Sequence, residues 1–242
     1  MTGASTFDID GCAGTALLGE AAVIIWNDVA EEGRAQFYEW HDKEHIPERL
    51  SIPGFRRGRR YSRPQHSPQW LTMYEADNLQ VLTSAAYLAR LNAPTSATAR
   101  ALEHFRNTSR AVCRIAHSRG SSSGGHMLAL RLAVPAEASD AMCEYMTADA
   151  FPGAMALTGV VACHLYAADE SASYVRTAES STRKFDVPSW VLLCEATFAE
   201  AAERARRLFE SAELRSRGVE VRSDAATYSL EICRESAPVR QR

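Results

Sequence analysis

The segment from Glu39 to Tyr61, EWHDKEHIPERLSIPGFRRGRRY, concentrates the side chains that are best suited to chemistry. His41 and His45 are four residues apart, so on a helix they share one face. Such a pair can transfer protons, coordinate a metal ion together with Glu44 or a distant histidine, or lie at a solvated helix end among salt bridges. The residue types alone leave these three possibilities open.

Of the two histidines, His45 is better suited to general acid–base catalysis. The helix is expected to end before Pro47, because proline pushes the preceding residue out of the helical region. A histidine in the last turn has its protonated form stabilised by the helix macrodipole. The pair has no accompanying HExxH or CxxC motif. It is therefore a weak metal signal, and we expect no metal.

The strand-like run FRRGRRY, residues 55–61, offers guanidinium groups to an anionic substrate. Alternation along a strand predicts one side with Phe55, Arg57, Arg59 and Tyr61, and another with Arg56, Gly58 and Arg60. We expect Arg59 or Arg60 to hold an anionic substrate group in a bidentate geometry. A structural network with Glu44, Glu48 and Glu75 is an equally good interpretation, because a buried arginine needs a partner.

Aromatic residues complete the candidate site. Tyr61 and Tyr74 are candidates to donate a hydrogen bond to a developing enolate oxygen. Trp40 and Trp70 are expected to line the substrate site, although aromatic residues on strands more often serve packing than recognition. Arg110 is interpreted as a structural residue.

These residues must be positioned by an α+β framework, because strand and helix periodicity alternate along the chain. The first half predicts strands at 20–29, 54–63, 69–77 and 109–118, with helices at 30–45 and 78–92 and a shorter helical piece to about residue 106. The second half predicts strands at 126–134, 159–169, 188–198 and 219–235, with helices at 138–151 and 199–214. The order is β-α-β-β-α-β in each half, which is typical of a ferredoxin-like unit.

Each such unit has helices on one face of its antiparallel sheet and leaves the other face bare. We therefore expect two tandem ferredoxin-like units whose antiparallel sheets pack face to face as an intrachain barrel, with a cleft between them and two free edges on each sheet, the last strand lying at one of these edges. Two separate domains are the alternative. The predicted boundaries are a flexible arm at 1–18, a unit carrying the site at 19–118, a linker at 119–125, a mainly structural unit at 126–235 and a tail at 236–242. The first helix of the second half carries no histidine, and the arginine cluster has no counterpart there.

Composition excludes several classes of protein. The net charge of −3 and the pI of about 6.2 give no electrostatic reason to expect a nucleic acid partner. No apolar run approaches the roughly 20 residues of a membrane span, so no membrane partner is expected either. The six cysteines form no CxxC pair and mostly lie in apolar stretches, which indicates reduced thiols in a cytoplasmic protein.

Taken together, the segments FYEWHDKEHIPERLSIPGFRRGRRY, YEADNLQVLTSAAYLARLNAPT and HFRNTSR resemble the EthD-like members of the dimeric α+β barrel superfamily. The resemblance covers about residues 26–114, whereas the second half matches only in pattern. The resemblance implies ferredoxin-like units packed sheet to sheet. It also implies that His45 corresponds to the motif histidine of the family, and that Trp40 and His41 correspond to the Trp-His pair that precedes it. The wider superfamily includes cofactor-free cyclases, decarboxylases, isomerases, dehydrochlorinases and monooxygenases, and some haem enzymes whose axial histidine has no match here.

These observations predict a cofactor-independent lyase or isomerase that acts on a small anionic, aromatic or conjugated catabolite. His45, with His41, supplies the acid–base chemistry in this interpretation. The alternative is a non-catalytic, small-molecule-binding or stress-related protein that uses the same cleft. We expect the site to be complete within one chain, and the Leu- and Ala-rich helix faces leave a homodimer open.

Overall fold

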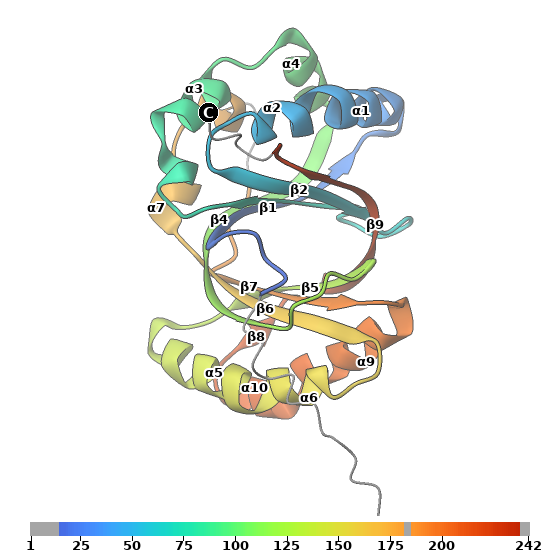
Figure 1. Cartoon of the computed structure of the whole chain (residues 1–242), viewed down its shortest axis with the longest axis vertical. Helices are drawn as coiled ribbons and strands as arrows, with labels where there is room; N and C mark the ends of the chain where they lie inside the picture. Colours follow the sequence, from blue (N-terminus) through green and yellow to red (C-terminus); the bar gives the residue numbers. More distant parts are fainter. Residues whose placement is uncertain (1–14, 182–184, 238–242) are drawn as a thin grey trace, which may run out of the picture.

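Eight antiparallel strands of the computed structural model form one closed barrel, with helices packed outside it on two opposite sides (Figure 1). The structure describes residues 15–181 and 185–237. The barrel strands are β1 (Ala21–Val29), β2 (Phe55–Ser62), β3 (Trp70–Ala76), β4 (Phe105–Arg119), β5 (His126–Ala133), β6 (Val160–Ala168), β7 (Trp190–Ala196) and β9 (Ala226–Glu235). A two-residue strand, β8 (Glu220–Val221), is added beside β5.

The strand order is β7-β6-β4-β1-β3-β2-β9-β5, and the pairing of β5 with β7 closes the barrel. The sequence predicted two sheets facing each other, each with free edges. Instead, β4 pairs with both β1 and β6, and β9 pairs with both β2 and β5. The last strand of each half therefore joins the two halves by backbone hydrogen bonds. Closure removes the edge on which the last strand was expected to lie.

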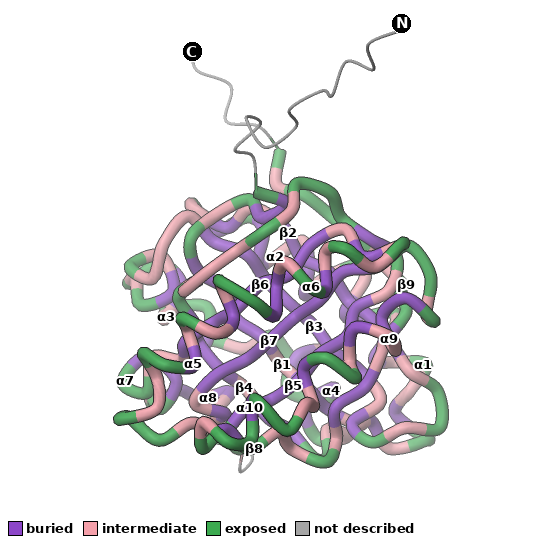
Figure 2. The backbone as a smooth tube through the Cα atoms, turned by 90° about the horizontal axis from the view of Figure 1, so that it is seen from below, coloured by how far each residue is buried: buried purple, intermediate pink, exposed green. Residues whose placement is uncertain are grey.

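The first helical layer contains η2 (Glu31–Gly33), α1 (Arg34–Trp40), η3 (His41–His45), α2 (Ile46–Leu50), η4 (Val81–Thr83), α3 (Ala85–Asn92) and α4 (Ser96–Glu103). The second contains η5 (Ala136–Ala138), α5 (Ser139–Tyr145), η6 (Met146–Ala150), α6 (Phe151–Met155), α9 (Ala199–Phe209) and α10 (Ala212–Ser216). Figure 2 shows the strands largely buried and the exposed residues mainly on the surrounding helices and loops. Within the described residues, no helix is long and apolar enough to cross a membrane.

The prediction that the first helix ends before Pro47 is wrong. Ile46 has φ −60° and ψ −49°, and α2 continues to Leu50. The preceding η3 is a π-helical turn in which the Ile46 N–H donates to the His41 carbonyl five residues back. This wider turn accommodates the proline, which would otherwise clash with the carbonyl four residues before it.

The second half repeats this feature: η6 is also a π-turn, and Pro152 follows it at the matching position. The turn therefore accompanies the proline and is not by itself evidence of a functional site.

The expected arm and linker are both tied to one end of the barrel. Residues 1–14 of the arm lie outside the described residues, but Leu17 packs into the barrel interior and the Ala16 N–H donates to the Gly120 carbonyl. In the linker, the Gly124 N–H donates to the carboxylate of Glu195.

One segment of the second half reaches across to the first. Between β6 and β7 lie two short helices, α7 (Glu170–Ser173) and α8 (Ala178–Ser181), which the sequence did not predict. Helix α7 lies against β4 and α8 against α3 (Figure 1). The Asp169 N–H donates to the Val112 carbonyl, and Ser173 Oγ accepts from the Val112 N–H. The second half therefore contributes to the surroundings of the first helical layer.

Candidate active site

A cavity lies between the outer face of the barrel and the first helical layer, over strands β1, β3 and β4. Its volume of about 40 Å³ is room for roughly three water molecules. Its polar lining comprises Asn27, His41, His45, Arg49, Thr72, Tyr74, Tyr87, Arg110 and Glu179. Its apolar lining comprises Ile25, Phe37, Trp40, Leu91, Leu102 and Phe105. The cavity is therefore on the helical side of the sheet, whereas the sequence predicted the site between two sheets.

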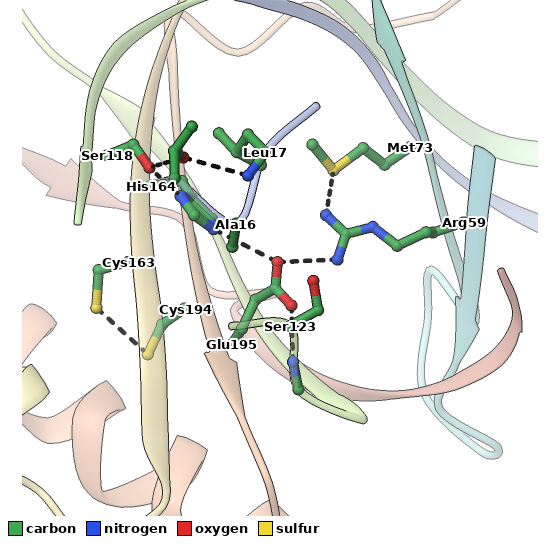
Figure 3. Close-up of polar contacts among 12 residues, drawn as sticks. Ala16, Leu17, Arg59, Met73, Ser118, Ser123, Cys163, His164, Cys194 and Glu195 are labelled. Carbon is green, nitrogen blue, oxygen red and sulfur yellow. Dashed lines mark hydrogen bonds and ion pairs between the residues drawn. The ribbon is translucent and has the colours of Figure 1, made fainter. Parts of the chain in front are cut away.

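The barrel interior is occupied by packed side chains. It holds a cluster that includes Trp26, Met73, Tyr166 and Tyr228, together with a charged network around Arg59 (Figure 3). Arg59 donates to Glu195 at 2.8 Å and lies 3.0 Å from the carboxylate of Glu75. The structure therefore does not bring Arg59 to the cavity.

Tyr61 lies on the same barrel-facing side of β2 as Arg59, and its ring is 5.8 Å from the Arg59 guanidinium carbon. Burial is the main reason that the pKa of Tyr61 is raised. A β-bulge between Phe55 and Arg57 reverses the side of Phe55 relative to the predicted alternation, so Phe55 packs on the helical side.

His41 is the central polar residue of the cavity wall. Its Nδ1 accepts from the Arg60 guanidinium at 2.9 Å, and its Nε2 lies 3.2 Å from the Tyr74 hydroxyl oxygen. An arginine N–H can only donate, so the neutral ring carries its proton on Nε2 and donates to Tyr74. Burial, with the charges of Arg60 and Arg49, holds the pKa of His41 well below its usual range. The ring is therefore neutral, with a fixed tautomer.

Tyr74 is positioned by this contact and by the strand beneath it. Its ring packs over Gly58, where a Cβ would lie 3.1 Å from the ring. Burial raises the pKa of Tyr74, so the hydroxyl stays protonated. Because its oxygen accepts from His41, its own O–H can donate to a molecule in the cavity.

His45 lies one helical turn further along the same face. Its ring is 4.3 Å from the Trp40 ring and 5.5 Å from the His41 ring, measured between centroids. Trp40 is held in turn by a hydrogen bond from its Nε1 to Thr98. The macrodipole argument for His45 does not hold, because the helix continues past it. Packing, rather than a helix end, orients this imidazole.

Arg60 and Trp70 lie behind the cavity rather than in its wall. Arg60 is bound by Asp42 and by Glu231 of β9, the latter at 2.7 Å, and it lies over the Tyr38 ring. Trp70 donates to the Tyr38 hydroxyl. Arg60 therefore acts on the cavity through His41, not through direct substrate contact.

Two arginines line the cavity, Arg49 and Arg110, and the sequence analysis missed the first of them. Arg49 is buried, donates to Glu179 of α8 at 2.5 Å, and lies over the Tyr87 ring. Its signal was present in the sequence, because His41, His45 and Arg49 follow at intervals of four. The assumption that Pro47 ends the helix hid it. Arg110, interpreted as structural, lies in the cavity wall and donates to the Tyr87 hydroxyl.

The second half offers an internal comparison, because its strands pair with the same register and the same bulge. Its counterparts of His41, His45 and Tyr74 are Met146, Ala150 and Cys194, which belong to a closed apolar core. By contrast, the barrel-facing Glu75 and Tyr61 have identical counterparts in Glu195 and Tyr166. The charged interior is thus shared by the halves, whereas the polar cavity is specific to the first.

Comparison with known proteins gives a fold but no close relative. No family model and no curated protein matches the chain. A solved anthrone oxidase-like protein matches with a TM-score of 0.59 and 14% identity, over 92% of this chain and 95% of that one. The chain has the dimeric α+β barrel fold.

Two further solved structures have the same fold. A protein from Lactobacillus acidophilus, provisionally named a monooxygenase, matches with a TM-score of 0.55 and 9% identity, over 90% of this chain and 97% of that one. A chlorite dismutase variant from Candidatus Nitrospira defluvii matches with a TM-score of 0.52 and 11% identity, over 90% and 92%. At these identities the likeness concerns the fold alone.

The described residues were compared with two other kinds of reactive site, a metal centre and a reactive cysteine. Within 15–181 and 185–237, no group of three His, Cys, Asp or Glu side chains is arranged to hold a metal ion. The cysteines in this part of the chain, Cys113, Cys143, Cys163, Cys194 and Cys233, are free thiols. Cys12 lies outside the described residues.

Proposed function

We propose that the chain is a small-molecule enzyme that transfers protons on a planar carbonyl or phenol substrate bound beside His45 and Tyr74. The observation that carries this proposal is the chain of contacts from Arg60 to His41 to Tyr74, which leaves a protonated tyrosine hydroxyl aimed at the cavity. A fixed donor of this kind stabilises negative charge as it develops on a substrate oxygen. The aromatic lining suits a flat, conjugated ring.

The reaction begins with removal of a C–H proton next to the substrate carbonyl. His45 accepts this proton, and the electron pair of the broken C–H bond moves into the enolate, whose oxygen accepts from Tyr74. In an isomerase, His45 returns the proton to a different carbon. In a lyase, the enolate electrons expel a leaving group such as halide, and the proton is later lost to water. The residues of the chain supply each of these steps, so we propose no metal or organic cofactor.

A second outcome starts from the same carbanion. The fold neighbours described as anthrone oxidase-like and as a monooxygenase favour oxygenation without a cofactor. Dioxygen would add to the carbanion, and loss of water from the resulting peroxide would convert the CH₂ group into a ketone. Chlorite dismutase-like chemistry is less well supported, because the cavity chemistry is centred on His41, His45 and Tyr74 without a metal-binding group of side chains in the described part of the chain.

The remaining parts of the proposal concern family and setting. We propose that the chain is an EthD-like protein with two tandem ferredoxin-like units, the first catalytic and the second mainly structural. The non-catalytic alternative, a binding or stress-related protein, fits a solvent-exposed His45 better than the buried one observed. We propose that the partner is a small molecule and that the protein is cytoplasmic. Whether the chain forms a homodimer is a question for experiment.

Substrate screening tests the reaction class. A panel of cyclic carbon acids, including anthrone and 2-tetralone, would be incubated in D₂O under nitrogen and then in air. We expect NMR to detect enzyme-dependent C–H exchange under nitrogen for a lyase or isomerase, and oxygen uptake with ketone formation for the oxygenase outcome. Binding of panel members without exchange or turnover under either atmosphere would contradict both and support the non-catalytic alternative.

A further inference from the structure

A second hollow adjoins the histidine-bearing cavity. The two share Leu91, Arg110 and Glu179 in their walls. The second is bounded mainly by apolar side chains of the first helical layer and of the segment that crosses over from the second half, namely Leu82, Leu88, Ala172, Val175 and Phe185. Arg110 therefore stands at the junction between an acid–base cavity and an apolar hollow.

The two arginines at this junction, Arg49 and Arg110, differ in whether their hydrogen-bond partners are charged or neutral. Arg49 lies 2.5 Å from the carboxylate of Glu179 and 3.5 Å from that of Glu48. Arg110 donates only to neutral oxygens among the contacts found in the described chain, the Ser173 carbonyl at 3.3 Å and the Tyr87 hydroxyl at 3.4 Å. Both distances exceed the usual range for an N–H···O bond. The carboxylate of Glu179 also lines both hollows, but its 2.5 Å contact is with Arg49.

We propose that Arg110 binds the carboxylate group of the substrate, and that the apolar body attached to this carboxylate extends into the second hollow, whose volume of about 30 Å³ must increase on binding. The planar guanidinium offers parallel N–H groups that match a carboxylate. Tyr87 strengthens the subsite, because its oxygen accepts from Arg110 and its O–H is left to donate to the same anion. The inference rests on the proposed function for the chemistry at His45, and it adds the substrate class: a flat aromatic or conjugated carboxylate.

The competing explanation is structural: Arg110 ties β4 to α7 through the Ser173 carbonyl. That role needs no anion, so it predicts no preference between a carboxylate ligand and its neutral amide. The two explanations therefore separate in a binding experiment that requires no turnover.

The test is calorimetric titration of 2-naphthoate and 2-naphthamide into the full chain and three variants. We expect the unaltered chain to bind the carboxylate at least about tenfold more tightly than the amide, as a charge-assisted contact requires. Arg110→Gln should reduce this preference to within about twofold while leaving amide binding unchanged, and Arg110→Lys should retain part of it. Arg114→Gln, an exposed arginine on the same strand, should leave the preference intact.

Three results would overturn the subsite: no preference in the unaltered chain, no naphthoate binding at millimolar concentration, or an unchanged preference in both Arg110 variants. Circular dichroism checks that Arg110→Gln is folded, and Arg110→Lys decides the question if it is not. His45→Gln should keep the carboxylate preference. A chain that prefers naphthoate through Arg110 but catalyses no proton exchange would keep the subsite and refute the proposed function.

Discussion

The Nδ1 atom of His41 accepts a hydrogen bond from Arg60 at 2.9 Å, and this contact fixes the direction of the hydrogen bond between His41 and Tyr74. Arg60 is itself fixed by Asp42 and Glu231, so β9 of the second half indirectly orients a histidine of the first. Because the guanidinium cannot accept a proton, His41 must donate through Nε2 toward Tyr74. A positively charged neighbour thus makes an imidazole serve as a fixed hydrogen-bond donor.

We predict that the His41 ring is still neutral at pH 6.5, where an ordinary histidine is half protonated. Burial and then the charge of Arg60 lower its pKa, so protonation requires a pH well below the ordinary value. Replacing Arg60 with Gln removes one of these causes and should move the pKa upward. Histidine ¹⁵N NMR titration measures both states. Titration of His41 at its ordinary pKa in the unaltered chain would contradict the tautomer assignment.

The acid stability of the barrel should depend on Glu195. Burial alone would raise its pKa, but His164 and Arg59 hold it at about 2, below the ordinary 4.5. A lowered folded-state pKa means that the stabilisation is present above pH 4.5 and is lost as the pH falls toward 2. The difference corresponds to about 3 kcal/mol of unfolding free energy. Urea unfolding between pH 2 and pH 7 should reveal this loss.

Glu195→Gln should flatten the pH dependence and lower the unfolding free energy at pH 7 by roughly 3 kcal/mol, because it leaves Arg59 less compensated inside the barrel. Glu144→Gln, on the exposed face of α5, is the matched control and should change little. Equal effects of the two substitutions would refute a special role for the interior network.

The Arg49–Glu179 pair should control access to the cavity. A cavity of about 40 Å³ is too small for an aromatic ring, so its walls must move when a substrate enters. Glu179→Gln weakens the attachment of α8 to α2, and we expect faster amide exchange in α8 and faster ligand association. Glu170→Gln, at an exposed position of α7, should alter neither rate. Unchanged exchange and association in Glu179→Gln would show that entry uses another route.

The site should be complete within one chain, because the barrel closes within the chain and its second half supplies Glu179 to the cavity wall. Turnover per chain, or ligand binding per chain, should therefore stay constant across a dilution series followed by light scattering. Activity that disappears as a dimer dissociates would contradict this prediction.

Sequence periodicity located seven of the eight barrel strands to within four residues, because strand alternation and turn residues are local properties, but it merged β8 and β9 into one strand over residues 219–235. It predicted an intrachain barrel of two facing sheets. It could not predict how the barrel closes, because the pairings of β4 with β6 and of β9 with β2 join distant segments. The asymmetry between the halves was visible in the sequence, because the helix that carries His41 and His45 has no histidine in its second-half counterpart. Alternation along β2 also placed Arg59 and Arg60 on opposite sides, as observed, whereas Phe55 lies on the unexpected side because the bulge beside it is a tertiary feature.

Two further signals were available but were not used. WLTMYEA and WVLLCEA, residues 70–76 and 190–196, share the buried Glu and differ at the cavity Tyr, which separates the interior network from the candidate site. The regular spacing of His41, His45 and Arg49 would have extended the helix past Pro47. The segment containing α7 and α8 lacks such a pattern, so its contact with the first half could come only from the structure.

The most direct test of proton transfer at this cavity is the rate of solvent deuterium exchange into the best carbon acid of the panel, for the unaltered chain and for His45→Gln. We predict at least a hundredfold loss of exchange in the variant, which is typical when a general base is removed, with ligand affinity changed by no more than about threefold. Glu144→Gln, on the exposed face of α5, should exchange at the unaltered rate. Exchange by His45→Gln at the rate of the unaltered chain would contradict the assignment of His45 as the base.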